Sequence, residues 1–232
     1  MRLFSLSTAE QGASMALFQD HDLICESYLT GPKSHSRRLM SMVENMIVHQ
    51  AGLEVSDIDG FIAAKGPGSF TGLRIGISVV KGLAVAVSKP CAGISSLDGI
   101  AYRFSTASVP VCVMMDAKRK EVYTAVYRFS QGKLAGKSEE LACAPEQAIG
   151  LAGRDAIFVG SGSKAYADMI KEFTGAWISP ASMDHVSALA LVERAWEISD
   201  LFDDKANCLV PTYLRQSDAE IHHSHFSQKS VS

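Results

Sequence analysis

The stretch Lys65-Gly66-Pro67-Gly68-Ser69-Phe70-Thr71-Gly72-Leu73-Arg74-Ile75-Gly76 joins an apolar run at 61–64 to a longer apolar run that ends at Val87. Its glycines permit positive φ angles and close backbone approach, and its proline stiffens the turn between the first two. Ser69 and Thr71 are residue types that favour the N-cap of a helix. The stretch therefore predicts a strand, a tight glycine loop and a helix in succession.

A glycine loop in front of a helix can hold a phosphate, because free N–H groups and the positive end of the helix dipole face the ligand. A P-loop needs Gly-Lys-Ser/Thr at its end, whereas Leu73 follows Gly72 here, and the dinucleotide pattern needs a glycine where Thr71 stands. Two interpretations stay open: an anion-binding loop, and a buried loop whose glycines let the helix approach the sheet. The spacing favours the buried loop.

The chain has 232 residues, of which 47% are hydrophobic and 20% charged, with a net charge of −3. These values fit a packed globular protein of one large domain or two small ones, and they argue against unaided nucleic-acid binding. The five cysteines include no C-x-x-C pair, which favours buried free thiols in a reducing compartment. Residues 1–10 resemble a strand more than a signal peptide, and the apolar segment 73–87 is short for a membrane span and contains Lys81. We expect cytoplasmic localisation and no membrane contact.

Hydrophobic periodicity predicts the same order of elements twice. The first half predicts strands at 3–6, 14–18 and 23–29, a helix at 36–50, a strand at 60–64, a helix at 72–87, a strand at 91–94 and a helix at 96–104. The second half predicts strands at 109–115, 121–129 and 132–141, a short helix at 145–150, a strand at 156–160 and helices at 163–172 and 182–201.

Three strands in hairpins followed by helix–strand crossovers make a mixed sheet covered by helices. The repeated order therefore predicts a duplicated α/β fold with two mixed-sheet subdomains. We place the N-terminal subdomain at 1–104 and the C-terminal one at 105–215, with the boundary near 103–109. The segment 216–232 is polar and without apolar periodicity, and we expect it to be a flexible tail.

The predicted helix at 72–87 is apolar around most of its circumference, so a second side of it needs cover besides the sheet. One interpretation is a face for another chain, shared with the methionine-rich helix at 36–50, because methionine adapts to partner surfaces. The other is a core helix wedged between the two halves of one chain. The predicted interface residues are Leu39, Met42, Val43, Met46, Ile75, Val79, Val80 and Leu83.

No catalytic or metal-binding set can be assembled from the spacing of residues. H-E-x-x-H and G-x-S-x-G are both absent. The H-H-x-H pattern at 222–225 is either a solvated tail or a weak metal site. Gly160 and Gly162 follow a predicted strand, and they either touch a ribose or phosphate or form a tight turn. Asp116 precedes the charged hairpin 117–121 and is either a functional carboxylate or part of a solvated turn.

The quoted stretch resembles the hallmark segment of the bacterial TsaB (YeaZ) family, and the resemblance extends over nearly the whole chain. Its signature-loop residues are Gly66, Pro67, Gly68, Ser69, Phe70, Thr71, Gly72 and Arg74. Further motifs that resemble the family follow in the expected order: His35-Ser36 with Leu39, Gly93-Ile94-Ser95-Ser96-Leu97, Asp116-Ala117-Lys118-Arg119-Lys120-Glu121-Val122-Tyr123 and Pro211-Thr212-Tyr213-Leu214-Arg215.

The resemblance implies a duplicated actin, hexokinase and Hsp70-like fold, of the ribonuclease H-like type. It implies a role in making threonylcarbamoyladenosine next to the anticodon of tRNAs that read codons beginning with A. The chain would be a non-catalytic partner of a TsaD-type subunit, which carries the metal-holding histidines and transfers the group. A TsaE-type ATPase would join the pair, tRNA would be contacted only through the complex, and the isolated chain could form a homodimer. The implied partner surface is the two N-terminal helices, and no cofactor is required.

One departure from the family lies at the end of the first strand, where relatives read Asp-Thr and this chain reads Leu6-Ser7-Thr8. Ser7 has no charge to hold a cation, and Glu10 is expected to point elsewhere. We therefore expect no independent ATP hydrolysis. Weak ATP or ADP binding, mainly in the complex, would involve Ser7, Thr8, Gly160 and Gly162.

Two alternatives to a non-catalytic partner stay open. The first is a nucleotide-binding enzyme of the same superfamily, similar to a kinase or a peptidase. The second is direct tRNA binding by the basic clusters Arg37-Arg38 and Lys118-Arg119-Lys120.

Overall fold

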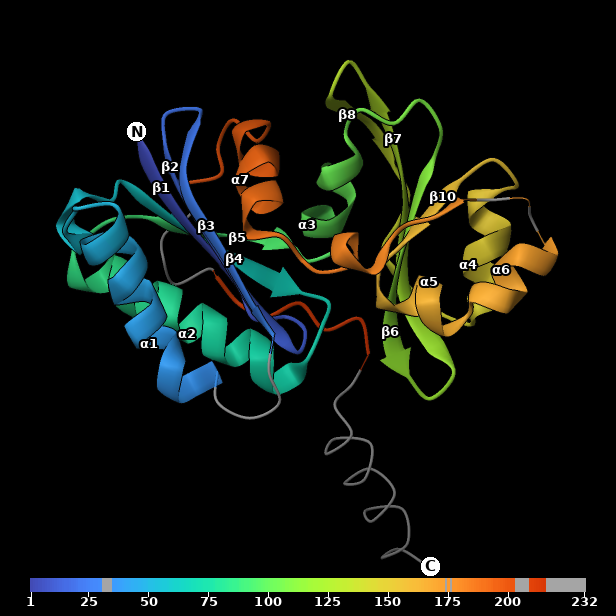
Figure 1. Ribbon diagram of the computed structural model, residues 1–232, viewed down its shortest axis with the longest axis horizontal. Coiled ribbons are helices and arrows are strands. Elements are labelled where there is room, and N and C mark those ends of the chain that lie inside the picture. Colours follow the sequence, from blue (N-terminus) through green and yellow to red (C-terminus); the bar gives the residue numbers. More distant parts are fainter. Residues whose placement is uncertain (31–34, 174, 176, 203–208, 216–232) are drawn as a thin grey trace, which may run out of the picture.

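The computed structural model describes residues 1–30, 35–173, 175, 177–202 and 209–215, which form two lobes that each contain a mixed sheet (Figure 1). The first sheet has the strand order β3-β2-β1-β4-β5. Its strands β1, β2 and β3 pair antiparallel, and β4 and β5 are parallel to β1. The bounds are β1 Arg2–Ser7, β2 Gly12–Gln19, β3 Asp22–Thr30, β4 Gly60–Gly66 and β5 Cys91–Ser95.

The second sheet repeats this topology with the strand order β11-β10-β6-β7-β8, and β9 pairs with β7. The bounds are β6 Val111–Lys118, β7 Glu121–Ser130, β8 Lys133–Lys137, β9 Leu141–Cys143, β10 Ile157–Val159 and β11 Trp177–Ile178. With β9 set aside, the first strand of each half lies at the centre of its sheet, between the second and the fourth. The same connectivity in both halves confirms the predicted duplicated actin-like, ribonuclease H-like fold.

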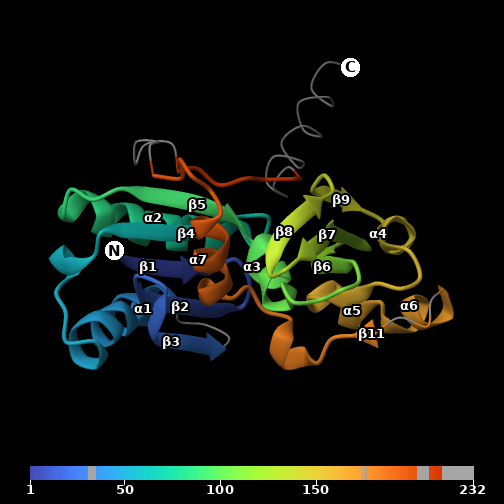
Figure 2. The same cartoon turned by 90° about the horizontal axis from the view of Figure 1, so that it is seen from above.

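Helices cover both sheets. The first sheet is covered on one face by α1 His35–Glu44, continued by a π-helical turn Asn45–Gln50, and by α2 Phe70–Ala86. Between the two sheets lie α3 Asp98–Ala101, followed by a 3-10 turn Tyr102–Phe104, and α7 Ala188–Trp196 (Figures 1 and 2). The outer part of the second lobe contains α4 Pro145–Ala152 and α6 Ala167–Phe173, whereas α5 Ser161–Ala165 lies beside β6 and begins on the side that faces the first lobe. Single 3-10 turns are Val55–Asp57 and Ala181–Met183.

The chain returns to the first sheet at its C-terminal end. Helix α7 packs against β1, β2, β4 and β5, and against α3. Leu191 of α7 shares one apolar core with Ile62 of the first sheet and Val113 of the second. The sheets thus divide the chain between β5 and β6, whereas α7 covers the sheet of the other half. The assignment of 105–215 to a single subdomain stays a prediction.

Three predicted elements differ most from the observed ones. The helix expected at 163–172 is interrupted at Tyr166, whose ψ of 27° ends α5 before α6 begins. The strand expected at 132–141 divides into β8 and β9, because Ser138 turns back to bond the N–H and C=O of Val126. The helix expected at 182–201 is shorter and begins at the N-cap Ser187. The two-residue strand β11 was not predicted.

The glycines of the signature loop lie directly against neighbouring backbone. A Cβ added to Gly72 would lie 2.1 Å from the carbonyl oxygen of Thr8, and one added to Gly68 would lie 2.5 Å from that of Ala9. The Ala9 oxygen accepts a 2.7 Å hydrogen bond from the N–H of Ser69, whose side chain in turn caps α2 by accepting from Gly72 N–H. The glycines of this loop therefore bring α2 onto the β1–β2 turn, and Ser69 is confirmed as the N-cap.

Two glycines of the same helix provide a test of this packing. Gly72→Ala inserts a methyl into the Thr8 carbonyl and should destabilise the fold by about 2 kcal/mol or more. Gly82 is exposed with no atom within 4 Å of an added Cβ, so Gly82→Ala should stabilise it by about 0.5–1 kcal/mol through helix propensity. Urea unfolding of both variants measures these changes, and equal effects at the two positions would contradict the close approach.

Candidate functional site

The turn after β1 meets the start of α5 across the space between the lobes, and Glu10 makes the contact. One carboxylate oxygen of Glu10 accepts a 3.1 Å hydrogen bond from the Ser161 hydroxyl, and the other accepts a 3.2 Å bond from the Val186 N–H. The Ser161 hydroxyl also accepts from the N–H of Asp116 at 3.1 Å. Glu10 therefore connects the first lobe to β6, α5 and the segment before α7. The expectation that Glu10 points away from this region is wrong.

Burial of the Glu10 carboxyl raises its pKa to about 7, because desolvation penalises the charged form. The bonds from Ser161 and Val186 lower this pKa, and the nearby negative charge of Asp184 raises it. Glu10 therefore titrates near neutral pH, in a contact that joins the two lobes.

Asp184 lies near Glu10 and binds the loop that precedes α5. Its Oδ1 atom accepts hydrogen bonds from the Gly160 N–H at 3.0 Å and from the Ser179 hydroxyl at 2.5 Å. Next to it, the ring of His185 stacks on Tyr28 of β3 with 3.8 Å between centroids. Burial and the neighbouring Arg103 guanidinium lower the pKa of His185 to about 4, so its imidazole is neutral at pH 7.

The residues predicted to bind nucleotide are engaged within the chain. Ser7 and Thr8 are buried; the Ser7 hydroxyl accepts from Ala9 N–H, and the Thr8 hydroxyl donates to the carbonyl oxygen of Gly72. Gly160 and Gly162 lie against the carbonyl oxygen of Met114, 2.5 Å and 2.9 Å from where a Cβ would be. Glu10 lies two residues after Thr8, and Ser161 lies between Gly160 and Gly162. The Glu10–Ser161 hydrogen bond therefore brings the two predicted pairs near each other between the lobes.

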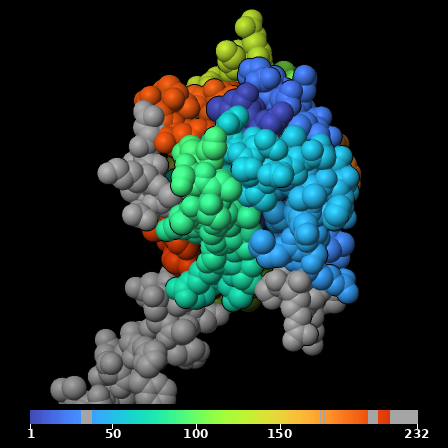
Figure 3. Space-filling view, turned by 90° about the vertical axis from the view of Figure 1, so that its left-hand side faces the viewer, coloured from blue at the N-terminus to red at the C-terminus, as the bar shows by residue number. Residues whose placement is uncertain are grey.

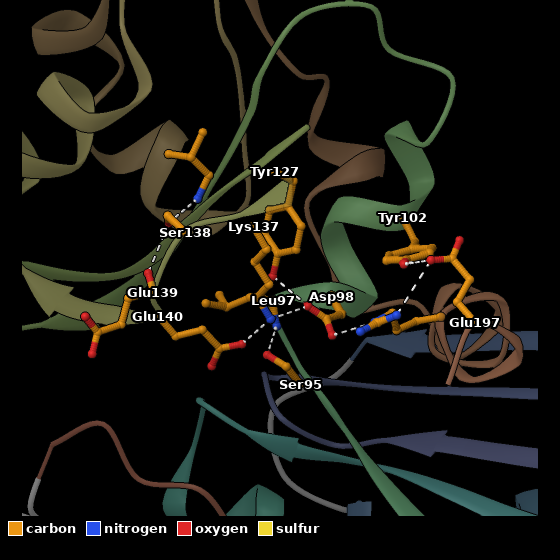
Figure 4. Close-up of polar contacts among 12 residues, drawn as sticks. Ser95, Leu97, Asp98, Tyr102, Tyr127, Lys137, Ser138, Glu139, Glu140 and Glu197 are labelled. Atoms are coloured by element: carbon orange, nitrogen blue, oxygen red, sulfur yellow. Dashed lines mark hydrogen bonds and ion pairs between the residues drawn. The ribbon is translucent and has the colours of Figure 1, made fainter. Parts of the chain in front are cut away.

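A second group of polar contacts joins the lobes at Asp98 of α3 (Figure 4). The Asp98 carboxylate is nearly buried and accepts from the Tyr127 hydroxyl at 2.8 Å and from Lys137 Nζ at 2.6 Å. Its other oxygen lies 3.5 Å from Nε of Arg194 on α7, and Arg194 also pairs with Glu197. Because a buried charge that loses its partner costs about 3–5 kcal/mol, this network favours one arrangement of α3, α7 and the second sheet. No sequence motif had indicated it.

The segment 209–215 runs from the first lobe to the second. The Thr212 N–H donates to the carbonyl oxygen of Lys65 at 2.7 Å, and the Arg215 guanidinium pairs with Glu121 of β7 at 2.9 Å. Between them, Tyr213 stacks on Phe70 and accepts from Arg74 Nε. Two motifs of the family resemblance that are far apart in sequence, the glycine stretch and the C-terminal one, are thus in direct contact.

The β6–β7 hairpin, which contains Asp116, ends in three exposed basic residues, Lys118, Arg119 and Lys120. Lys118 pairs with Glu121 in the ladder, so the turn itself is Arg119-Lys120. All three residues have positive φ angles of 53–62°, a conformation that costs about 1 kcal/mol or more for a residue other than glycine. The Asp116 carboxylate accepts from both the N–H and the Nζ of Lys118, at 2.8 and 2.6 Å.

The predicted interface residues fall into two groups. Leu39, Val43, Met46 and Val80 are buried in the core between the helices and the first sheet, so a partner cannot reach them. Met42, Ile75, Val79 and Leu83 are only partly buried beside that core. The outer side of α2 bears Arg74, Ser78, Gly82 and Val85 and faces solvent next to α1 (Figure 3). Since α2 covers an outer face, the wedged-helix interpretation is wrong.

Metal-ligand and membrane features were sought in the part of the chain that the structure describes. Within it, no three residues among His, Cys, Asp and Glu gather as a metal site would require. None of its helices combines the length and the hydropathy that a bilayer span needs. The H-H-x-H pattern at 222–225 and the tail predicted at 216–232 lie outside the described residues.

The pKa of Glu10 predicts an unusual pH dependence of stability. The folded protein holds a proton on Glu10 up to about pH 7, whereas an unfolded chain releases it near 4.5, so this residue lowers stability as pH rises between those values. Glu10→Gln removes the charge and keeps the size, and it should be more stable than the parent at pH 8 by about 3 kcal/mol, with the difference lost near pH 4.5. Urea unfolding at both pH values measures this, and a difference independent of pH would contradict the assignment.

Comparison with known proteins agrees with this geometry. A family model described as TsaD, tRNA N6-adenosine threonylcarbamoyltransferase, matches residues 30–223. The TsaB protein of Bacillus subtilis is 29% identical over 95% of this chain and 96% of its own length, and that of Escherichia coli is 32% identical over 74% and 76%. The structure of YeaZ from Pseudomonas aeruginosa superposes with a TM-score of 0.77 at 29% identity, covering 92% of this chain and 99% of that one.

These relatives match the chain along most of its length and in its fold, as the motifs around the glycine loop predicted. The protein described above therefore belongs to the TsaB (YeaZ) family, whose members in Bacillus subtilis and Escherichia coli are named tRNA threonylcarbamoyladenosine biosynthesis proteins.

Proposed function

We propose that this chain is a non-catalytic subunit that binds and activates a TsaD-type transferase in the biosynthesis of threonylcarbamoyladenosine in tRNA. The observation that carries the proposal is the outer side of α2. Ser78, Gly82 and Ala86 recur every four residues along it and are exposed. Small side chains at this spacing let a second helix approach closely.

Exposed apolar side chains accompany this small-residue stripe. Val85 on α2 is 67% exposed, and Met40 and Val48 on the neighbouring helical segment are 48% and 42% exposed. The stripe and these side chains together form what we term the α1–α2 face. An apolar rim around small residues suits another helical surface better than water. The same face would serve a homodimer of the isolated chain, in which case the transferase and a second copy compete.

The side chains between the lobes favour a supporting role over independent catalysis. The Glu10 carboxylate accepts from Ser161, the Asp184 carboxylate accepts from Gly160 N–H and the Ser179 hydroxyl, and the His185 ring is stacked on Tyr28. A reaction centre would need a nucleophile or base free to meet a substrate. In the proposed complex, the transferase supplies the chemistry, a TsaE-type ATPase joins, and ATP or ADP binds weakly if at all to this chain.

Matched glycine substitutions test the α1–α2 face. Gly82 on α2 and Gly150 on α4 are both exposed helical glycines with no atom within 4 Å of an added Cβ. Gly82→Arg should fold normally yet reduce retention of the co-expressed transferase at least about tenfold, since a bulky charge meets the partner helix. Gly150→Arg adds the same side chain to the other lobe, and this variant should retain the transferase fully.

Tagged pull-down with sizing of the complex gives the measurement. Equal retention of the transferase by both variants would count against the α1–α2 face. Multiple turnover of ATP by the isolated parent chain would count against a non-catalytic subunit. Val80, which was among the predicted interface residues, is unsuitable for such a test, because a charge at this fully buried position would disrupt the core.

A further inference from the structure

The tip of the β6–β7 hairpin, residues 118–120, contains turn residues that its backbone does not favour. A two-residue hairpin turn with positive φ at both positions is normally Asn-Gly or Asp-Gly, because these residues adopt that conformation at the least cost. Here the turn is Arg119-Lys120, with φ angles of 53° and 62°, and Lys118 before it has a φ of 61°. The requirements of the turn therefore do not explain the basic residues.

The three side chains are exposed at the end of a long ladder that extends beyond the body of the second lobe (Figure 1). The chain as a whole has a net charge of −3, so a run of three cations is a local departure from its overall charge. Asp116 pairs with Lys118 of the tip itself, and Glu121 pairs with Arg215. The excess positive charge of the tip therefore comes from Arg119 and Lys120.

The segment 209–215 connects the hairpin to a planar, partly exposed group. Arg215 pairs with Glu121, the residue after the tip, and two residues before it Tyr213 stacks on Phe70 with 4.9 Å between centroids. The guanidinium of Arg74 lies over the ring of Phe70, 3.8 Å from its centroid. Cations beside stacked aromatic and guanidinium planes are typical of surfaces that meet nucleic acid.

We propose that the hairpin tip 118–120 binds the phosphate backbone of RNA when the chain is part of the transferase complex. This inference rests on the proposed function, which brings tRNA to that complex. Three side chains of a weakly acidic protein supply too little attraction for strong binding alone, so the tip acts as one contact among those of the whole assembly. Phosphate contacts of this kind set the position of the RNA and carry no sequence preference.

The double substitution Arg119→Asn/Lys120→Gly separates the charge from the fold. It provides the residues that the turn favours, so it should raise the thermal midpoint by ~2 °C. It removes two cations, so the complex should bind an unmodified tRNA transcript several-fold more weakly, and the slope of log K against log salt should become shallower by about 1 to 2.

Two control variants accompany it. Arg119→Lys/Lys120→Arg keeps both charges on the same strained turn and should retain parental affinity and salt slope. Arg128→Ser/Lys133→Ser removes two exposed cations at the opposite end of β7, where it pairs with β8, and should leave RNA binding unchanged.

Transferase retention and RNA affinity are measured on the same preparations, so that the two proposals fail separately. A parent chain that does not retain the transferase contradicts the proposed function, and the RNA titrations are then made on the chain alone. Unchanged RNA affinity and salt slope in Arg119→Asn/Lys120→Gly overturn the RNA contact. Loss of transferase retention in that variant overturns it too, because the tip would then meet an acidic protein surface.

Discussion

The carbonyl oxygens of Thr8 and Ala9 lie where side chains at Gly72 and Gly68 would otherwise stand, and the placement of α2 depends on this contact. The contact places the first turn of the helix against the β1–β2 turn. There the Ser69 N–H donates to the carbonyl oxygen of Ala9, and the Thr8 hydroxyl donates to that of Gly72. Seated in this way, α2 turns Leu73, Ile77 and Val80 to the sheet. The exposed stripe of Ser78, Gly82 and Ala86 follows from the same rotation about the helix axis. A packing constraint at one end of a helix thus determines which side of α2 stays exposed, and this is the side that we propose meets another chain.

The lobes are joined by polar groups whose charges are largely removed from water. Asp98 gathers Tyr127, Lys137 and Arg194 on one side, and Glu10 binds Ser161 and Val186 on the other. The first network keeps its charges paired, whereas Glu10 accepts from two neutral donors, the Ser161 hydroxyl and the Val186 N–H, and burial raises its pKa to about 7. A contact that lowers stability at neutral pH is maintained by the surrounding structure, as strained features at functional sites are.

Much of the fold could be predicted from local pattern. The strand-like runs of β1, β2 and β6, the helical spacing around Leu39 and Val43, and the cap at Ser69 are properties of short segments, and the structure agrees with them. The repeated order of elements also predicted the duplication. Errors arose where long-range contacts decide. Ser138 turns away to bond Val126, and α7 ends up on the first sheet, because partners distant in sequence are invisible to periodicity.

The candidate site shows the same limit. The family motifs and the absence of a catalytic pattern were legible in the sequence, as were the apolar residues of the two helices. Only the tertiary structure decided which of those residues are core, since burial of Val80 and exposure of Val85 depend on the rotation of α2. It also directed Glu10 to Ser161 and placed Arg215 beside Glu121. The sequence determines which local conformations have low free energy. The packing of distant segments determines which side chains meet, because the energies of those contacts exist only in the folded chain.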